Sequence, residues 1–154
     1  MNAVQVEQKS YEMPPRDGIS VAHFLTVADI DRSLRFYETV FGGRALSRGD
    51  SKGAPGYIQI ANTWLLVNVG GGPTPGPTPD KPSVTLSVLA DPDKISSFMN
   101  IRVADIQACY KLWKSRGAEF ITEPIPKYGE TRCYIRDPDG YIIEVGQSTS
   151  LTYG

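Results

Sequence analysis

The chain has 154 residues, of which 40% are hydrophobic and 21% charged, and its formal net charge is −1 with a pI of about 5.8. This is the composition of one folded globular domain. The sequence contains no cluster of Lys and Arg and no apolar run of 18 residues, which excludes nucleic acid and membranes as expected partners and predicts a cytoplasmic protein.

In chain order, the first 18 residues form a polar N-terminal tail without an apolar signal core. After it, an internal repeat organises the sequence. The tetrapeptide Val-Ala-Asp-Ile occurs at 27–30 and again at 103–106, each time after a short apolar stretch and before apolar residues at helical spacing. Asp29 and Asp105 suit the N-caps of two helices, and glycines at 42 and 117 suit their C-terminal ends.

A second match follows each expected helix. Residues 57–67 (YIQIANTWLLV) align with residues 134–144 (YIRDPDGYIIE), so that Val67 lies over Glu144, and both segments have the pattern of a β-hairpin. Residues 44–48 and 119–123 leave room for one further strand in each copy. The sequence therefore predicts an α+β fold made of two βαβββ modules.

The expected boundaries follow from this repeat. The first module spans 19–68, a Gly/Pro-rich connector spans 69–95, the second module spans 96–148, and together they form one structural domain. Within the connector, residues 69–82 are either a plain linker or a flap over a pocket, and residues 83–90 are expected to add a short strand.

Cys109 and Cys133 are the only cysteines, and His23 is the only histidine. The two cysteines form no CxxC motif, so we expect two free thiols in a reducing compartment and no disulfide. Nothing in the sequence near Cys133 marks its thiol as an activated nucleophile.

The repeated Val-x-Asp-apolar motif and the closing Asp-Pro-Asp-Gly-Tyr-Ile-Ile-Glu segment resemble the vicinal oxygen chelate superfamily, which includes glyoxalase I, extradiol dioxygenases, and fosfomycin- and bleomycin-resistance proteins. The resemblance implies a curved mixed sheet around a cleft between the modules, a homodimer, and a small organic molecule as ligand or substrate. It also implies a divalent metal, such as Zn, Ni, Mn or Fe, held by His and Glu on facing strands. Glu144 matches the ligand of the last strand, whereas the first-strand position falls on Ala22, one residue before His23.

A metal site of this chain would use Glu144 and His23, but one histidine is too few for the full ligand set. We therefore expect a glyoxalase/bleomycin-resistance-like protein with a degenerate or absent metal site. Two alternatives remain open: a metal-dependent lyase, isomerase or dioxygenase, and a non-catalytic resistance protein that sequesters its ligand.

Catalysis without a metal is a further possibility. Arg102 lies in a strand interior, where a charge needs a partner or a ligand. It would either bind a substrate carboxylate while Glu144 acts as a general base, or form an internal salt bridge with Glu144. The remaining ligand-binding candidates are expected at the cleft; they are Phe24, Thr26, Phe98, Asn100, Arg132 and Tyr134. Phe24, Thr26, Phe98 and Asn100 share strand parity with the expected metal positions. The loop 127–132 is expected to close one end of the cleft, with Arg132 as a second contact for an anion.

Overall fold

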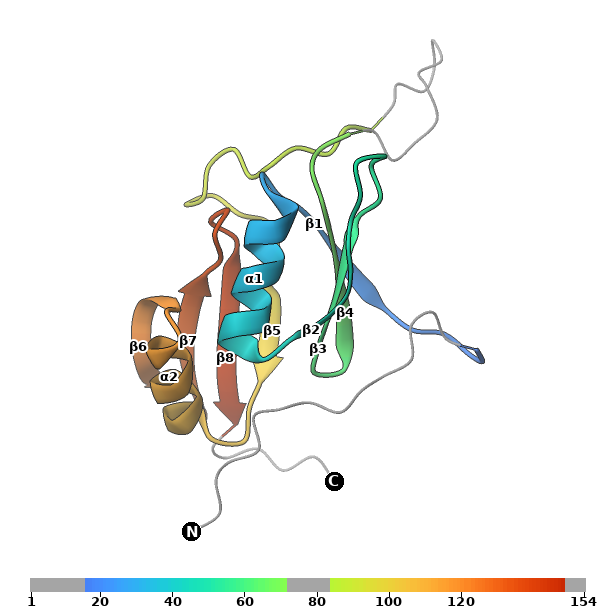
Figure 1. Ribbon diagram of the computed structural model, residues 1–154. Coiled ribbons are helices and arrows are strands. Elements are labelled where there is room, and N and C mark those ends of the chain that lie inside the picture. The colour runs from blue at the N-terminus through green and yellow to red at the C-terminus, as the bar shows by residue number, and fades with distance from the viewer. Residues whose placement is uncertain (1–15, 72–83, 149–154) are drawn as a thin grey trace.

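The structure is a computed structural model that describes residues 16–71 and 84–148. The expectations for most of the N-terminal tail and for most of the 69–82 linker or flap concern residues outside these ranges. The elements follow the order βαβββ twice, as Figure 1 shows. Their bounds are β1 Ala22–Thr26, α1 Ile30–Phe41, β2 Arg44–Arg48, β3 Gly56–Ile60, β4 Thr63–Asn68, β5 Met99–Arg102, α2 Ile106–Ser115, β6 Glu119–Lys127, β7 Glu130–Arg136 and β8 Ile142–Ser148.

Each module forms its own four-stranded mixed sheet. The strand order is β1-β4-β3-β2 in the first sheet and β5-β8-β7-β6 in the second. In both sheets the first strand of the module pairs in parallel with its last strand, and the other pairs are antiparallel. The duplicated α+β fold predicted from the internal repeat is therefore confirmed.

The helices begin where the repeated motif predicted. The Asp29 carboxylate accepts a 3.0 Å hydrogen bond from the backbone N–H of Arg32, and Asp105 accepts one of the same length from Ala108. These bonds satisfy N–H groups that have no partner within the first helical turn. Gly42 ends α1 in the left-handed conformation, with φ of 69°.

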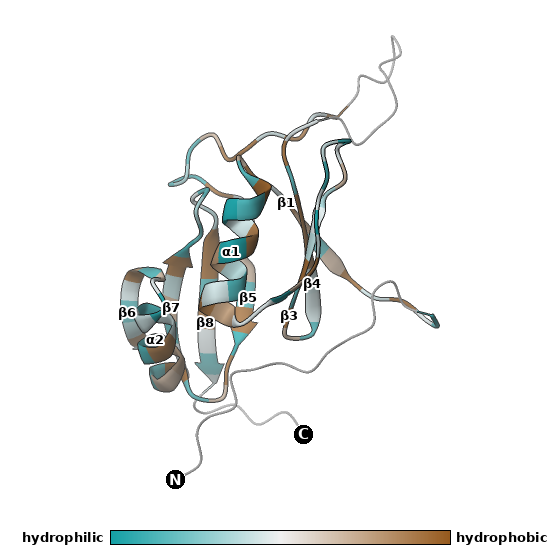
Figure 2. Cartoon of the chain, viewed as in Figure 1, coloured by the Kyte–Doolittle hydropathy of each residue, from teal (hydrophilic) through white to brown (hydrophobic). Residues whose placement is uncertain are grey.

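One hydrophobic core joins the two modules. Leu34, Tyr37 and Phe41 of α1 and Cys109 and Trp113 of α2 belong to the same buried cluster. The rings of Phe41 and Trp113 meet edge to face, with 4.8 Å between their centroids. Figure 2 shows hydrophobic stretches along β1 and β8, and both strands contribute residues to this core.

The two hairpins differ by one residue from the ungapped sequence alignment. Phe24 pairs with Leu66 at the place in the first sheet where Asn100 pairs with Glu144 in the second. Leu66 therefore corresponds to Glu144, and the expectation that Val67 does so is wrong.

The turns explain this difference. Residues 61–62 join β3 to β4, whereas the longer segment 137–141 joins β7 to β8. An alignment without a gap therefore loses register after the turn.

The expected strand at 83–90 is also wrong for the residues described. Leu86 forms only an isolated antiparallel bridge with Gly71, and no strand follows it before β5. The rest of the segment leads into β5 without forming a helix or strand. Within residues 16–71 and 84–148, no helix is long and apolar enough to cross a membrane.

Candidate functional site

Most of the predicted polar site residues meet on one face of the second sheet. This polar sheet face, which is turned away from α2, consists of Asn100, Arg102, Arg132, Tyr134 and Glu144. Cross-strand pairing places Glu144 of β8 between Asn100 of β5 and Tyr134 of β7. Side chains of directly paired residues point to the same side of a sheet, so the register alone brings these three groups together.

Glu144 is nearly buried, with 9% of its surface exposed, and two neutral donors satisfy it. The Asn100 amide donates a hydrogen bond to Oε1, and the Tyr134 hydroxyl donates one of 2.6 Å to Oε2. The bond to the carboxylate raises the pKa of Tyr134, because loss of the phenolic proton would break it and place two negative charges together. Tyr134 therefore acts as a hydrogen-bond donor, and the carboxylate remains the acceptor at the centre of this face.

The two arginines of the polar sheet face share another carboxylate. Arg102 Nη2 lies 2.5 Å from Glu130 Oε1, and Arg132 Nη2 lies 2.9 Å from Glu130 Oε2. The hydrogen bonds from Arg132 and Arg102 lower the pKa of Glu130. The predicted salt bridge between Arg102 and Glu144 is therefore wrong, since Arg102 pairs with Glu130 from the start of β7.

Two local features concern the arginines of this face. Gly146 has no side chain, and a Cβ at this position would collide with the Arg102 guanidinium, which lies across β8. The Nε of Arg132 is buried without a hydrogen-bond partner among the described residues. A buried N–H group without a partner costs free energy, so a bound acceptor would stabilise it.

His23 does not meet Glu144 within the chain. It pairs with Leu65 in an uninterrupted β1–β4 ladder, and no bulge turns it toward the second sheet. Its side chain lines a pocket between the modules, and no residue of the polar sheet face lines that pocket. Residues 16–71 and 84–148 contain no group of three or more His, Cys, Asp or Glu side chains that could hold a metal ion. With both Glu144 oxygens bonded to neutral donors, the donor set of the described chain does not fit a catalytic divalent metal.

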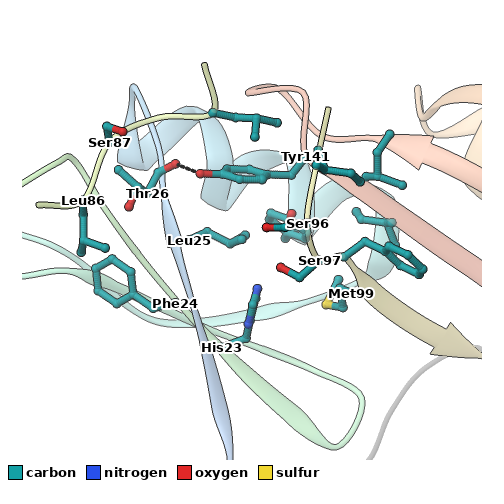
Figure 3. Close-up of a pocket in the computed structure, with 16 residues that line it drawn as sticks. His23, Phe24, Leu25, Thr26, Leu86, Ser87, Ser96, Ser97, Met99 and Tyr141 are labelled. Atoms are coloured by element: carbon teal, nitrogen blue, oxygen red, sulfur yellow. Dashed lines mark hydrogen bonds between the residues drawn. The ribbon is translucent and has the colours of Figure 1, made fainter. Parts of the chain in front are cut away.

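The other predicted ligand-binding residues lie in this second location. The inter-module pocket has a volume of about 420 Å³ and is lined by β1, the segment before β5 and the beginning of β8, including Phe24, Thr26 and Phe98. Figure 3 shows Tyr141 across the pocket, where its hydroxyl donates a 2.7 Å hydrogen bond to the carbonyl of Thr26. The structure therefore divides the predicted site residues between the pocket and the polar sheet face.

Several residues of the pocket were not singled out by sequence reasoning. Ser87, Ser96 and Ser97 line it from the segment that leads into β5. This segment has no helical or strand periodicity, so no pattern in the sequence indicates which of its side chains face inward. Only their position next to β5 could have drawn attention to them.

Both cysteines are free and buried. Burial raises the pKa of Cys109 to about 11 and that of Cys133 to about 12. Neither thiol is ionised near neutral pH, which agrees with the expectation that neither is an activated nucleophile.

Comparisons with known proteins agree with this architecture. The family model described as the Glyoxalase/Bleomycin resistance protein/Dioxygenase superfamily matches residues 20–145. Among curated proteins, metallothiol transferase FosB of Lysinibacillus sphaericus (strain C3-41) is 39% identical over 51 residues, which are 32% of this chain and 34% of FosB. The match thus spans about a third of that relative.

Solved structures that share the fold include an antibiotic binding protein and a fosfomycin resistance protein. TnmS3, an antibiotic binding protein from Streptomyces sp. CB03234, has a TM-score of 0.60 at 18% identity over 87% of this chain and 98% of its own. The fosfomycin resistance protein FosX from Listeria monocytogenes has a TM-score of 0.58 at 16% identity over 87% of this chain and 95% of its own. Together with the family match over most of its length, this shows that the chain belongs to the glyoxalase/bleomycin resistance protein/dioxygenase superfamily.

Proposed function

We propose that this protein binds a small organic molecule on the polar sheet face without a metal ion. The observation that carries the proposal is the environment of Glu144. A nearly buried carboxylate is fixed by Asn100 and Tyr134 on a face that also carries two arginines. Each carboxylate oxygen can accept a second hydrogen bond, so a ligand that offers a donor to Glu144 and an acceptor to Arg132 would fit this face.

A metal-assisted lyase, isomerase or dioxygenase reaction that uses Glu144 and His23 is the weaker alternative. The uninterrupted ladder of β1 directs His23 into the inter-module pocket, away from the polar sheet face. Of the two predicted metal ligands, Glu144 and His23, the cation would therefore contact only Glu144. A functional zinc site needs three protein ligands.

One structural relative, TnmS3, supports a binding role, and FosX supports a role in resistance. TnmS3 is described as an antibiotic binding protein, and FosX as a fosfomycin resistance protein. In the same proposal, the protein sequesters its ligand as a homodimer, in which a second copy covers the polar sheet face. Arg102 is 45% exposed in the single chain, so this face is open to such a partner.

A second candidate is a metal-free enzyme. Glu144 Oε2 and the Tyr134 hydroxyl are 2.6 Å apart, so a carboxylate base and a phenolic donor stand side by side on an open face. Substrate turnover that is lost in Glu144→Gln, with substrate binding retained, would favour this enzyme over a sequestering protein.

Ligand-observed NMR in EDTA tests the main proposal. The probes are fosfomycin and a set of small carboxylic acids and amides. We expect at least one probe to bind the metal-stripped protein, and Arg132→Gln and Glu144→Gln each to weaken that binding about tenfold. Arg44→Gln, on the exposed edge strand β2, is the matched control and should leave it unchanged. Binding that appears only after Zn²⁺ or Mn²⁺ is added would overturn the proposal. An affinity that is the same in both variants as in the wild type would also overturn it.

A further inference from the structure

The inter-module pocket is separate from the polar sheet face. Its walls come from β1, from residues 86–99 and from Tyr141, Ile142 and Ile143, and they include none of the five residues of the polar sheet face. A molecule in this pocket would therefore not touch the residues of the proposed function.

The lining of the pocket is mostly apolar and carries no Asp, Glu, Lys or Arg side chain. Leu25, Leu86 and Met99 are among its apolar lining residues, as Figure 3 shows. Phe24 and Phe98 also line it and are 39% and 48% exposed, which is unusual for large aromatic side chains. Such walls favour an uncharged ligand, because an ion would lose hydration without gaining a counter-charge.

Some polar groups of the pocket are already used. The Tyr37 hydroxyl donates a hydrogen bond to Asp137, and the Tyr141 hydroxyl donates one to the Thr26 carbonyl. Four other polar side chains of the lining have no hydrogen-bond partner among the described residues; they are His23, Ser87, Ser96 and Ser97. Figure 3 shows Ser96, Ser97 and His23 directed toward the middle of the pocket.

We propose that the inter-module pocket is a second small-molecule site, which takes a compact uncharged molecule such as a ring that carries hydroxyl and carbonyl groups. The volume of about 420 Å³ lies within the range of known ligand sites. The apolar walls hold the ring, and the free serine hydroxyls and the imidazole bind its polar substituents. This site is independent of the polar sheet face and of any metal.

The methyl group of Met99 provides a direct readout. The chain has three methionines, at positions 1, 13 and 99; Met99 lines the pocket, and the other two lie outside the described residues. In protein labelled with ¹³C at the methionine methyl groups, Met99→Leu assigns the relevant signal. The matched probes are 4-hydroxyacetophenone, which is uncharged, and 4-hydroxybenzoate, an anion of similar size.

We expect the uncharged probe to shift the Met99 signal saturably and to bind at least about tenfold more tightly than the anion. The double variant Ser96→Leu/Ser97→Leu fills the pocket from an exposed segment and should weaken binding by about tenfold or more. Ser51→Leu places the same change in an exposed turn and should have no effect. Thermal melting confirms that each variant is folded.

Three results would each overturn the proposal: no shift of Met99 with millimolar uncharged probe, equal affinity for the anion, or full affinity in the folded double variant. None of these variants changes a residue of the polar sheet face. A negative result for the pocket therefore does not affect the NMR test of ligand binding to the polar sheet face.

Discussion

The hydroxyl of Tyr37 donates a 2.9 Å hydrogen bond to the carboxylate of Asp137 and thereby joins helix α1 of the first module to the β7–β8 turn of the second. Both residues are buried, with 1% and 4% of their surfaces exposed. Asp137 also accepts 2.9 Å hydrogen bonds from the backbone N–H groups of Asp139 and Tyr141. The Asp-Pro-Asp-Gly turn thus fixes the modules to each other, in addition to reversing the chain.

Asp137 predicts a pH-dependent contribution to stability. Burial is the main cause that raises its pKa from 3.8 to about 6. The folded protein therefore binds this proton more tightly than the unfolded chain does. The resulting stabilisation is complete below pH 4 and is lost as the pH rises through 6.

Asp137→Asn should remove this dependence. We expect the free energy of unfolding of the wild type, relative to the variant, to fall by on the order of 2 kcal/mol between pH 4 and pH 7. Urea unfolding at several pH values measures the difference. Curves that stay parallel across this range would contradict the assignment.

Tyr37→Phe removes the donor from the buried carboxylate. We expect a loss of about 1 to 3 kcal/mol in the free energy of unfolding at pH 7, since Asp137 loses its side-chain partner. Tyr110→Phe is the control, because the Tyr110 hydroxyl accepts only an exposed 3.3 Å hydrogen bond from Lys114. Equal losses in the free energy of unfolding for the two substitutions would show that the hydrogen bond between Tyr37 and Asp137 does not stabilise the fold.

Asp139 forms the second link between the modules. Its side chain is 1% exposed, and it accepts 2.9 Å hydrogen bonds from the Ala28 backbone N–H and from Arg32. It also accepts a 3.3 Å hydrogen bond from the hydroxyl of Ser33, which is fully buried. Asp139→Ala should therefore cost about 2 to 3 kcal/mol in chemical unfolding, because it leaves this buried hydroxyl unpaired and removes the two shorter bonds near the start of α1. The control Asp93→Ala breaks a salt bridge of the same length to Arg136, but Asp93 is 81% exposed, so we expect a change within about 0.5 kcal/mol. A small effect at both positions would refute the role of burial.

Local sequence signals were sufficient for the fold. The N-caps Asp29 and Asp105 and the helix stop at Gly42 depend on interactions within a few residues, and they lie where the repeat predicted them. The strand Arg44–Arg48 was likewise expected from the space between helix and hairpin. Repetition strengthened each signal, because the same pattern appears twice in one chain.

The candidate site was only partly predictable for a physical reason. Strand parity brought Asn100, Arg102 and Glu144 to one face, but it could not show that Arg102 pairs with Glu130. That pairing depends on the β7–β8 register and on the missing side chain of Gly146, whose place the Arg102 guanidinium takes. The polar lining from Ser96 and Ser97 lies in an irregular segment, where no periodicity assigns side chains to a face.

The buried thiols predict low reactivity of the folded protein. Burial raises the pKa of Cys109 to about 11 and that of Cys133 to about 12, so almost no thiolate exists at pH 8. We expect Ellman's reagent to modify neither cysteine in the native protein and both after denaturation. Rapid modification of one cysteine under native conditions would show that its part of the core opens readily.

Two glycines in the strands should respond differently to alanine. At Gly56 a Cβ would lie 2.9 Å from Val67 Cγ2 and 3.0 Å from Ile30 Cγ2, within the packed core, so Gly56→Ala should cost about 1 to 3 kcal/mol in the free energy of unfolding. At Gly146 the atom that must move is the flexible end of Arg102, which is 45% exposed. Gly146→Ala should therefore lower the free energy of unfolding by less than about 1 kcal/mol. It should also displace Arg102 from Glu130 and thereby weaken ligand binding on the polar sheet face. Urea unfolding together with the NMR binding assay separates the two effects, and a Gly146→Ala variant as unstable as Gly56→Ala would show that Arg102 cannot move aside.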